Sequence, residues 1–162
     1  MGWHEAYLSQ AHSDYRIMIR LAATGVEYCH RLHYMQMLTE KLAKAMLTPA
    51  GRATPAPATH VAFVRMLQVL KGSPEFREEL GFSDAAVFRT YINSLLDLAG
   101  RIERLSPSLA GMNQPNPEYP WEDPITHTVR SPAEYDFQEF DPRDPRMIKI
   151  DRLIRDLLRI AT

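Results

Sequence analysis

The chain has 162 residues, of which 45% are hydrophobic, and its formal net charge is -1. This length suits one domain with a core of its own. A single cysteine, Cys29, excludes an intramolecular disulfide framework and favours a reducing compartment. No apolar run approaches the roughly 20 residues that cross a bilayer. We therefore expect one cytoplasmic domain over residues 1–162, with no membrane association.

The charge is unevenly distributed along the chain. Residues 14–71 carry +5 and residues 146–162 carry +3, whereas residues 72–145 carry -8. Such asymmetry favours a basic surface for an anionic ligand. It equally fits attraction between parts of the fold or between subunits, and both interpretations stay open.

The N-terminal part predicts two helices, the first from about residue 5 or 13 to 23 and the second over 26–47. Lys41 falls inside the apolar stripe of the second helix, and Asp14 lies on the inward side of the first. A half-buried ammonium needs water or a carboxylate. We therefore predict a polar contact between Asp14 and Lys41, which either fixes the register of the two helices or belongs to a site.

Two more helices follow a Pro, Ala and Thr loop. The first runs over 60–70, with Thr59 as its N-cap. The second begins after Ser83 as its cap and keeps an apolar helical period until Pro107, which makes it the longest clear helix. The pattern predicts no element between Gly72 and Ser83.

Residues 107–145 hold eight of the twelve prolines together with several aromatic residues. The prolines exclude a regular helix, and the aromatics indicate an ordered irregular loop that wraps the bundle. A last helix is expected from about Pro145 to Ile160. No segment predicts a convincing strand. The expected fold is therefore all-α, an up-and-down four- to five-helix bundle with a long loop before the last helix.

Several segments together resemble the HEPN family of small, nucleotide-linked helical bundles. Residues 40–45, EKLAKA, resemble the Glu-Lys-x-x-Lys-Ala signature of that family's second helix. His60 lies where many members have a histidine at the start of the third helix. Residues 118–120, EYP, resemble the end of an Arg-Tyr-Pro motif found before the last helix in part of the family. The similarity covers most of the chain.

The resemblance implies a bundle that dimerises, often beside a partner nucleotidyltransferase, with nucleotide or RNA contacts near the dimer cleft. A large branch of the family cleaves RNA with an Arg, four to six residues and a His. Here no histidine follows Arg101 at that spacing, seven residues separate Arg52 from His60, and Glu118 replaces the motif's Arg. We therefore expect no catalytic residues of the family type.

Cationic side chains are the main candidates for contacts to phosphate, namely Lys41, Lys44, His60 and Arg101. Each has a structural alternative. Lys44 lies four residues after Glu40, which is the spacing of a helical ion pair worth only about 0.2–0.5 kcal/mol. His60 shares its helix's apolar side and fits a satisfied interior histidine.

Tyr119 and Trp121 fit an aromatic platform for a base, or else packing of the loop on the bundle. His30 and His33 near Glu27 suggest only a weak metal site, because two histidines without an HExxH context are common on solvated helix faces, so we expect no metal. No phosphate-binding loop or dinucleotide motif is present, and we expect no cofactor.

Three functions remain open. The first is a non-catalytic homodimer that binds a nucleotide or RNA phosphate, with a nucleotidyltransferase as its candidate companion. The second is a purely structural protein partner, and the third is an RNase with a non-standard site. The expected ligand-binding residues are Asp14, Glu40, Lys41, Lys44, His60, Arg101, Tyr119 and Trp121.

Overall fold

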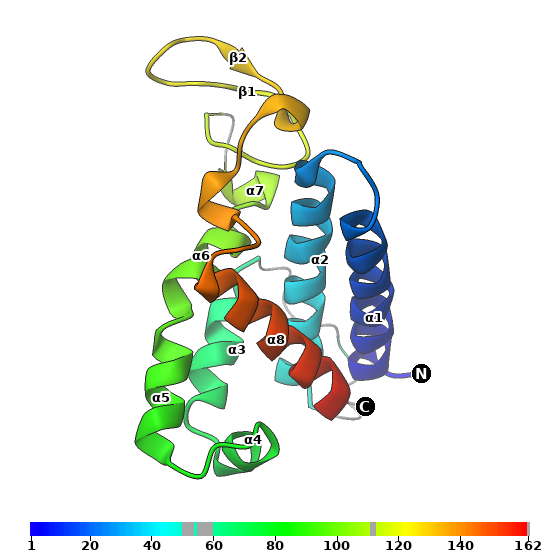
Figure 1. Cartoon of the computed structure of the whole chain (residues 1–162). Helices are drawn as coiled ribbons and strands as arrows, with labels where there is room; N and C mark the ends of the chain where they lie inside the picture. Colours follow the sequence, from blue (N-terminus) through cyan, green and yellow to red (C-terminus); the bar gives the residue numbers. More distant parts are fainter. Residues whose placement is uncertain (50–53, 55–59, 111–112, 162) are drawn as a thin grey trace.

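The computed structural model of the chain describes residues 1–49, 54, 60–110 and 113–161 (Figure 1). This part of the chain is mostly helical, which confirms the predicted all-α fold. Within it, no helix combines the length and the apolar character needed to cross a membrane.

Two long helices form the N-terminal half of the bundle. They are α1 (Trp3–Ala22) and α2 (Tyr28–Leu47), which lie side by side and antiparallel (Figure 1). Both were predicted, and α1 starts two residues before the earlier of its two expected starts. The hydroxyl of Thr24 donates to the Leu21 carbonyl at 2.9 Å and helps to end α1.

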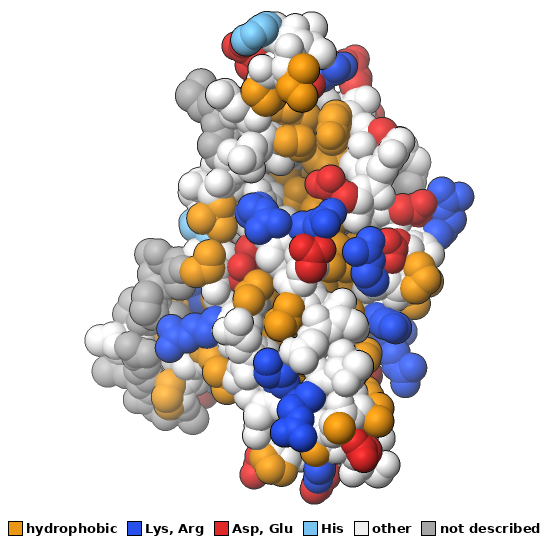
Figure 2. All heavy atoms as spheres, turned by 90° about the vertical axis from the view of Figure 1, so that its left-hand side faces the viewer, with side chains coloured by type: hydrophobic (Ala, Val, Ile, Leu, Met, Phe, Trp, Pro, Cys, Tyr) orange, Lys and Arg blue, Asp and Glu red, His pale blue; other side chains and the backbone are white. Residues whose placement is uncertain are grey.

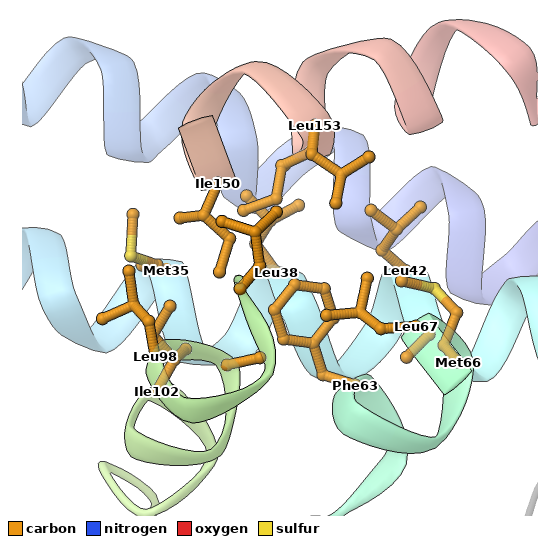
Figure 3. Packing of buried hydrophobic residues seen from close by; sticks show 14 of the residues in the cluster. Met35, Leu38, Leu42, Phe63, Met66, Leu67, Leu98, Ile102, Ile150 and Leu153 are labelled. Atoms are coloured by element: carbon orange, nitrogen blue, oxygen red, sulfur yellow. The ribbon is translucent and has the colours of Figure 1, made fainter. Parts of the chain in front are cut away.

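The core lies where α2 meets α3 (Ala62–Leu70), α6 (Leu96–Glu103) and α8 (Pro145–Ile160). Figure 3 shows side chains from all four helices filling the same space. Full burial of one such Leu or Phe side chain contributes about 1.5–3 kcal/mol. The core residues labelled in Figure 3 are Met35, Leu38, Leu42, Phe63, Met66, Leu67, Leu98, Ile102, Ile150 and Leu153.

The prediction of one long fourth helix is wrong. The chain instead forms α5 (Ala85–Asn93) and then α6, with a break at Ser94, whose hydroxyl donates to the Tyr91 carbonyl at 2.7 Å. The apolar period continues across the break because both helices bury residues in the same core.

Two caps also differ from prediction. Asp84, and not Ser83, caps α5, since its Oδ1 accepts hydrogen bonds from the backbone N–H groups of Ala86 and Val87 at 2.7 and 2.9 Å. Val61 occupies the N-cap position of α3 without a side-chain hydrogen bond, so α3 starts two residues later than expected. The predicted cap Thr59 lies outside the described residues.

A short helix that the sequence analysis missed, α4 (Pro74–Glu79), follows α3 directly. The hydroxyl of Ser73 caps it by accepting from the Phe76 N–H at 3.3 Å, and Pro74 occupies its first turn.

The proline-rich segment contains more regular structure than predicted. It holds the single turn α7 (Pro107–Ala110) and an antiparallel hairpin of β1 (Trp121–Glu122) and β2 (Val129–Arg130). Figure 1 shows the hairpin projecting beyond one end of the bundle. The chain then returns to α8 through two 3-10 turns, η1 (Pro132–Glu134) and η2 (Gln138–Phe140).

Candidate functional site

The predicted contact between Asp14 and Lys41 is present between α1 and α2. The Lys41 Nζ lies 3.0 Å from the Asp14 Oδ2, and the side chains are 18% and 3% exposed. Gln10 donates to the other Asp14 oxygen at 2.9 Å, and Lys41 also donates to the Met37 carbonyl at 3.4 Å. Both charges are therefore engaged inside the helix pair, where an ion pair fixes register.

Glu40, which precedes Lys41 on α2, contacts three polar partners. One carboxylate oxygen accepts from Lys44 at 2.6 Å, and the other contacts the His60 Nδ1 at 2.7 Å and Gln36 at 3.1 Å. Burial by itself would raise the pKa of Glu40, but the hydrogen bonds from Lys44 and His60 outweigh it and lower the pKa. Lys44 is thus satisfied, as the ion-pair interpretation predicted.

His60 is the solvent-facing member of this group. Its side chain is 40% exposed, whereas that of Glu40 is 14% exposed. Nδ1 faces the carboxylate, and among the described residues Nε2 has no hydrogen-bond partner, so Nε2 is the nitrogen that could meet a ligand. The chain enters α3 directly after His60, so the Glu40 cluster, which we define as Glu40, Lys44 and His60, lies where α2 meets the start of α3.

Glu103 is a buried carboxyl that the sequence analysis missed. It is 6% exposed, and its Oε1 accepts from the backbone N–H of Val64 at 2.9 Å. Because α3 has no side-chain cap of its own, Glu103 satisfies the start of that helix from across the core. Burial is the main cause that raises its pKa. In the sequence, Glu103 lies four residues after the inward Ala99, and this spacing could have predicted that its side chain faces the core.

A shallow groove of about 440 Å3 runs between α3 and α6. Arg65 and Arg104 border it, and within the described residues neither forms an ion pair. Gly100 lies on its floor, where an added Cβ would be 3.6 Å from the Arg104 guanidinium. Figure 2 shows Lys and Arg side chains spread over the α5 and α6 side of the molecule, with Asp and Glu among them. The groove is lined by Val61, Val64, Arg65, Gln68, Leu96, Asp97, Gly100, Glu103 and Arg104.

Arg101, the cation predicted on this helix, points to a smaller recess. It pairs with Asp97 at 3.1 Å and is 40% exposed. Arg101 and Arg104 together line a recess of about 210 Å3 next to Glu139. Since Arg104 lines both hollows, they adjoin each other.

The two predicted aromatic residues have different environments. Trp121 is 4% exposed, with its ring 4.9 Å from that of Tyr135 and 6.4 Å from that of Phe137. It therefore offers no face to a base, and the loop-packing alternative is the correct one for it. Tyr119 is 60% exposed.

The remaining histidine candidates bind carboxylates. His30 lies 3.7 Å from Glu27, and His33 lies 3.2 Å from Glu118. Among the residues that the structure describes, no three His, Cys, Asp or Glu side chains are grouped as a metal site requires.

The predicted cations therefore fall into three places and not one. Lys41 faces α1, Lys44 and His60 share Glu40, and Arg101 lies on α6. Lys41 and Lys44 are held by carboxylates inside the bundle, whereas the side chains of His60 and Arg101 are each 40% exposed. Comparison of the chain with protein-family models, with curated proteins and with solved structures gives no match.

Proposed function

We propose that the protein is a divergent HEPN-type bundle that binds a phosphate-bearing ligand, a nucleotide or an RNA, without cleaving it, in the groove between α3 and α6. The observation that carries the proposal is a pair of arginines, Arg65 and Arg104, on the two sides of this groove, neither of which forms an ion pair with another described residue. A guanidinium matches a phosphate because its N–H groups can donate two parallel hydrogen bonds. The volume of about 440 Å3 lies within the range of small-molecule sites.

Two features next to the groove also favour binding of a phosphate there. His60 directly precedes Val61, which lines the groove, so the Glu40 cluster lies at one end of it. Arg101 and Arg104 extend the basic lining to the adjoining recess. Asp97 and Glu103 also line the groove, and their charges oppose a polyanion, so we expect binding of moderate strength that weakens at high salt.

Gly100→Ala tests the groove without damaging the fold. The new Cβ would meet the Arg104 guanidinium at 3.6 Å and the Val64 side chain at 3.9 Å, which are ordinary contacts. Alanine in a helix is favoured over glycine by about 1 kcal/mol, so the melting temperature should rise by a few degrees. The methyl group narrows the groove floor, so the thermal shift caused by ATP or a short RNA should fall.

Arg104→Gln is the complementary variant, because it removes the charge shared by the two hollows. Arg16→Gln is its control, since Arg16 is exposed on α1 and forms no ion pair within the described residues. We expect the response to ATP and RNA to drop at least fivefold in Arg104→Gln and to persist in Arg16→Gln. Equal responses in both variants would exclude the groove.

A protein-binding role is the second candidate, and the hairpin favours it. Ile125 and Val129 are 88% and 76% exposed on a segment that projects from the bundle. Exposed apolar side chains in such a place mark interaction surfaces. We propose that the protein forms a homodimer and that a nucleotidyltransferase is a further partner. Sedimentation of the wild type and of an Ile125→Ser, Val129→Ser variant tests the dimer, which the variant should weaken.

RNA cleavage at a non-standard site remains the third candidate, and the contact between His60 and Glu40 favours it. A carboxylate that holds one imidazole nitrogen leaves the other nitrogen to move a proton. RNA degradation that survives repurification and is lost in His60→Ala would support this activity. Intact RNA in the presence of the wild type would contradict it.

A further inference from the structure

A second recess, separate from the groove, lies where three helices meet. It has a volume of about 180 Å3 and lies at the junction of α3, α4 and α5. Three of its eight lining residues are basic and none is acidic. No other hollow described above has a lining without a carboxylate. The lining residues are Lys71, Gly72, Ser73, Pro74, Arg77, Ala85, Phe88 and Arg89.

The three basic side chains come from three different helices. Lys71 caps the end of α3, Arg77 lies in the last turn of α4, and Arg89 lies on α5, four residues after Ala85 and thus on the same face. The chain folds back on itself between these helices, so the three cations converge although they span 19 positions from residue 71 to residue 89.

The donors of these cations are only partly used. Lys71 donates to the neutral amide oxygen of Asn93 at 3.2 Å. Arg77 pairs with Glu78 at 2.8 Å through one terminal nitrogen, but its Nε is buried without a partner. Arg89 is exposed and forms no ion pair within the described residues. A buried donor without an acceptor is destabilising, and an acceptor bound next to Arg77 would relieve that cost.

Nearby carboxylates balance the charge of the three cations. They are Glu78, which pairs with Arg77, Asp84, which accepts from the N-terminal N–H groups of α5, and Glu75, which accepts from the Ser73 hydroxyl at 2.7 Å. An anion would therefore be held by the donors that line the recess and not by an excess of positive charge. The volume is below the roughly 300 Å3 of typical small-molecule sites, so it fits a single compact group and excludes a whole nucleotide.

We propose that this recess binds one tetrahedral oxyanion, a phosphate that is either the free ion or the phosphomonoester of a small molecule. Lys71 and Arg89 supply accessible charge, and Arg77, whose buried Nε has no hydrogen-bond partner, is the third cation of the lining. The recess shares no lining residue with the groove between α3 and α6, so this proposal does not depend on the proposed function.

Calorimetric titration of the full chain with inorganic phosphate and with O-phosphoserine tests the proposal, with ionic strength held constant by sodium chloride. We expect saturable binding to the wild type and at least tenfold weaker binding to Arg89→Gln and to Lys71→Gln. Arg16→Gln, which removes an exposed arginine of α1, should bind like the wild type. Tighter binding of phosphate than of O-phosphoserine would assign the free ion, and the reverse order a monoester.

Two outcomes would overturn the proposal. One is the absence of saturable binding of either probe at tens of millimolar. The other is binding that survives both Arg89→Gln and Lys71→Gln. If that surviving binding is lost in Arg104→Gln, the anion belongs to the groove, and the proposed function gains support while this proposal fails.

Discussion

Two polar clusters are built on consecutive residues of α2, Glu40 and Lys41, and they differ in what surrounds them. Lys41 faces α1 and meets Asp14, whose side chain is 3% exposed, whereas Glu40 faces the start of α3 and meets His60, whose side chain is 40% exposed. Both clusters combine a carboxylate with a lysine. The first is closed by the packing of two long helices, and the second opens to solvent. The two lysine–carboxylate pairs are similarly buried, so the solvent-facing His60 is what distinguishes the cluster that can face a ligand from the pair that holds the fold.

Asp14→Ala should break the closed cluster and have the largest effect. It leaves the mostly buried Lys41 without a carboxylate, and removing one partner of a buried pair costs about 3–5 kcal/mol. Because Lys41 keeps some exposure, we expect a loss near 3 kcal/mol in urea unfolding. Asp97→Ala, which removes the exposed partner of Arg101, should cost less than about 0.5 kcal/mol. Similar losses in the two variants would contradict the distinction between closed and open pairs.

Glu40→Gln should affect the open cluster less, with a loss of about 1–2 kcal/mol near neutral pH. The pKa of Glu40 is lowered in the folded state, so its contribution is present above the ordinary value of 4.5 and is lost as the pH falls through the folded value. The difference in unfolding free energy between wild type and variant should therefore shrink below about pH 4.5. A difference that stays constant down to pH 3 would show that Glu40 is not paired as described.

Glu103→Gln extends the comparison to a buried carboxyl that forms no ion pair with any described residue. Burial raises the pKa of Glu103, so its charged form weakens the folded state as the pH rises through the folded value, which is the opposite sign to Glu40. The amide oxygen can still accept from the Val64 N–H. We expect a change within about 1 kcal/mol at pH 7, neutral or stabilising. A loss above 2 kcal/mol would mean that the charge itself is needed at the start of α3.

The sequence predicted the elements whose signals are local and long. The apolar periods of α1, α2 and α8 are sustained over 16 or more residues, and the position of Lys41 within such a period also predicted its partner on α1. The sequence pattern did not indicate the break at Ser94, because the apolar period stays in phase across it. The hairpin was missed because strands of two residues are too short for alternation to appear.

The candidate site was less predictable because its residues depend on tertiary placement. The sequence identified Lys44, Glu40 and His60, but it could not show that one carboxylate satisfies both cations. It also chose Arg101 and passed over Arg65 and Arg104, which come together only when α3 packs beside α6. Glu103 was missed for the same reason, since its partner is the backbone of another helix.

One titration tests the central claim, which is that the closed pair is structural and that the groove binds the ligand. A fluorescein-labelled single-stranded RNA, with ATP as competitor, would be titrated by anisotropy against the wild type, Arg104→Gln and the double variant Asp14→Leu, Lys41→Met. The double variant replaces the pair by apolar side chains of similar size, which folded proteins often tolerate. We predict that it keeps the wild-type affinity and that Arg104→Gln loses most of it. Binding that survives Arg104→Gln and is lost in the double variant would contradict the account.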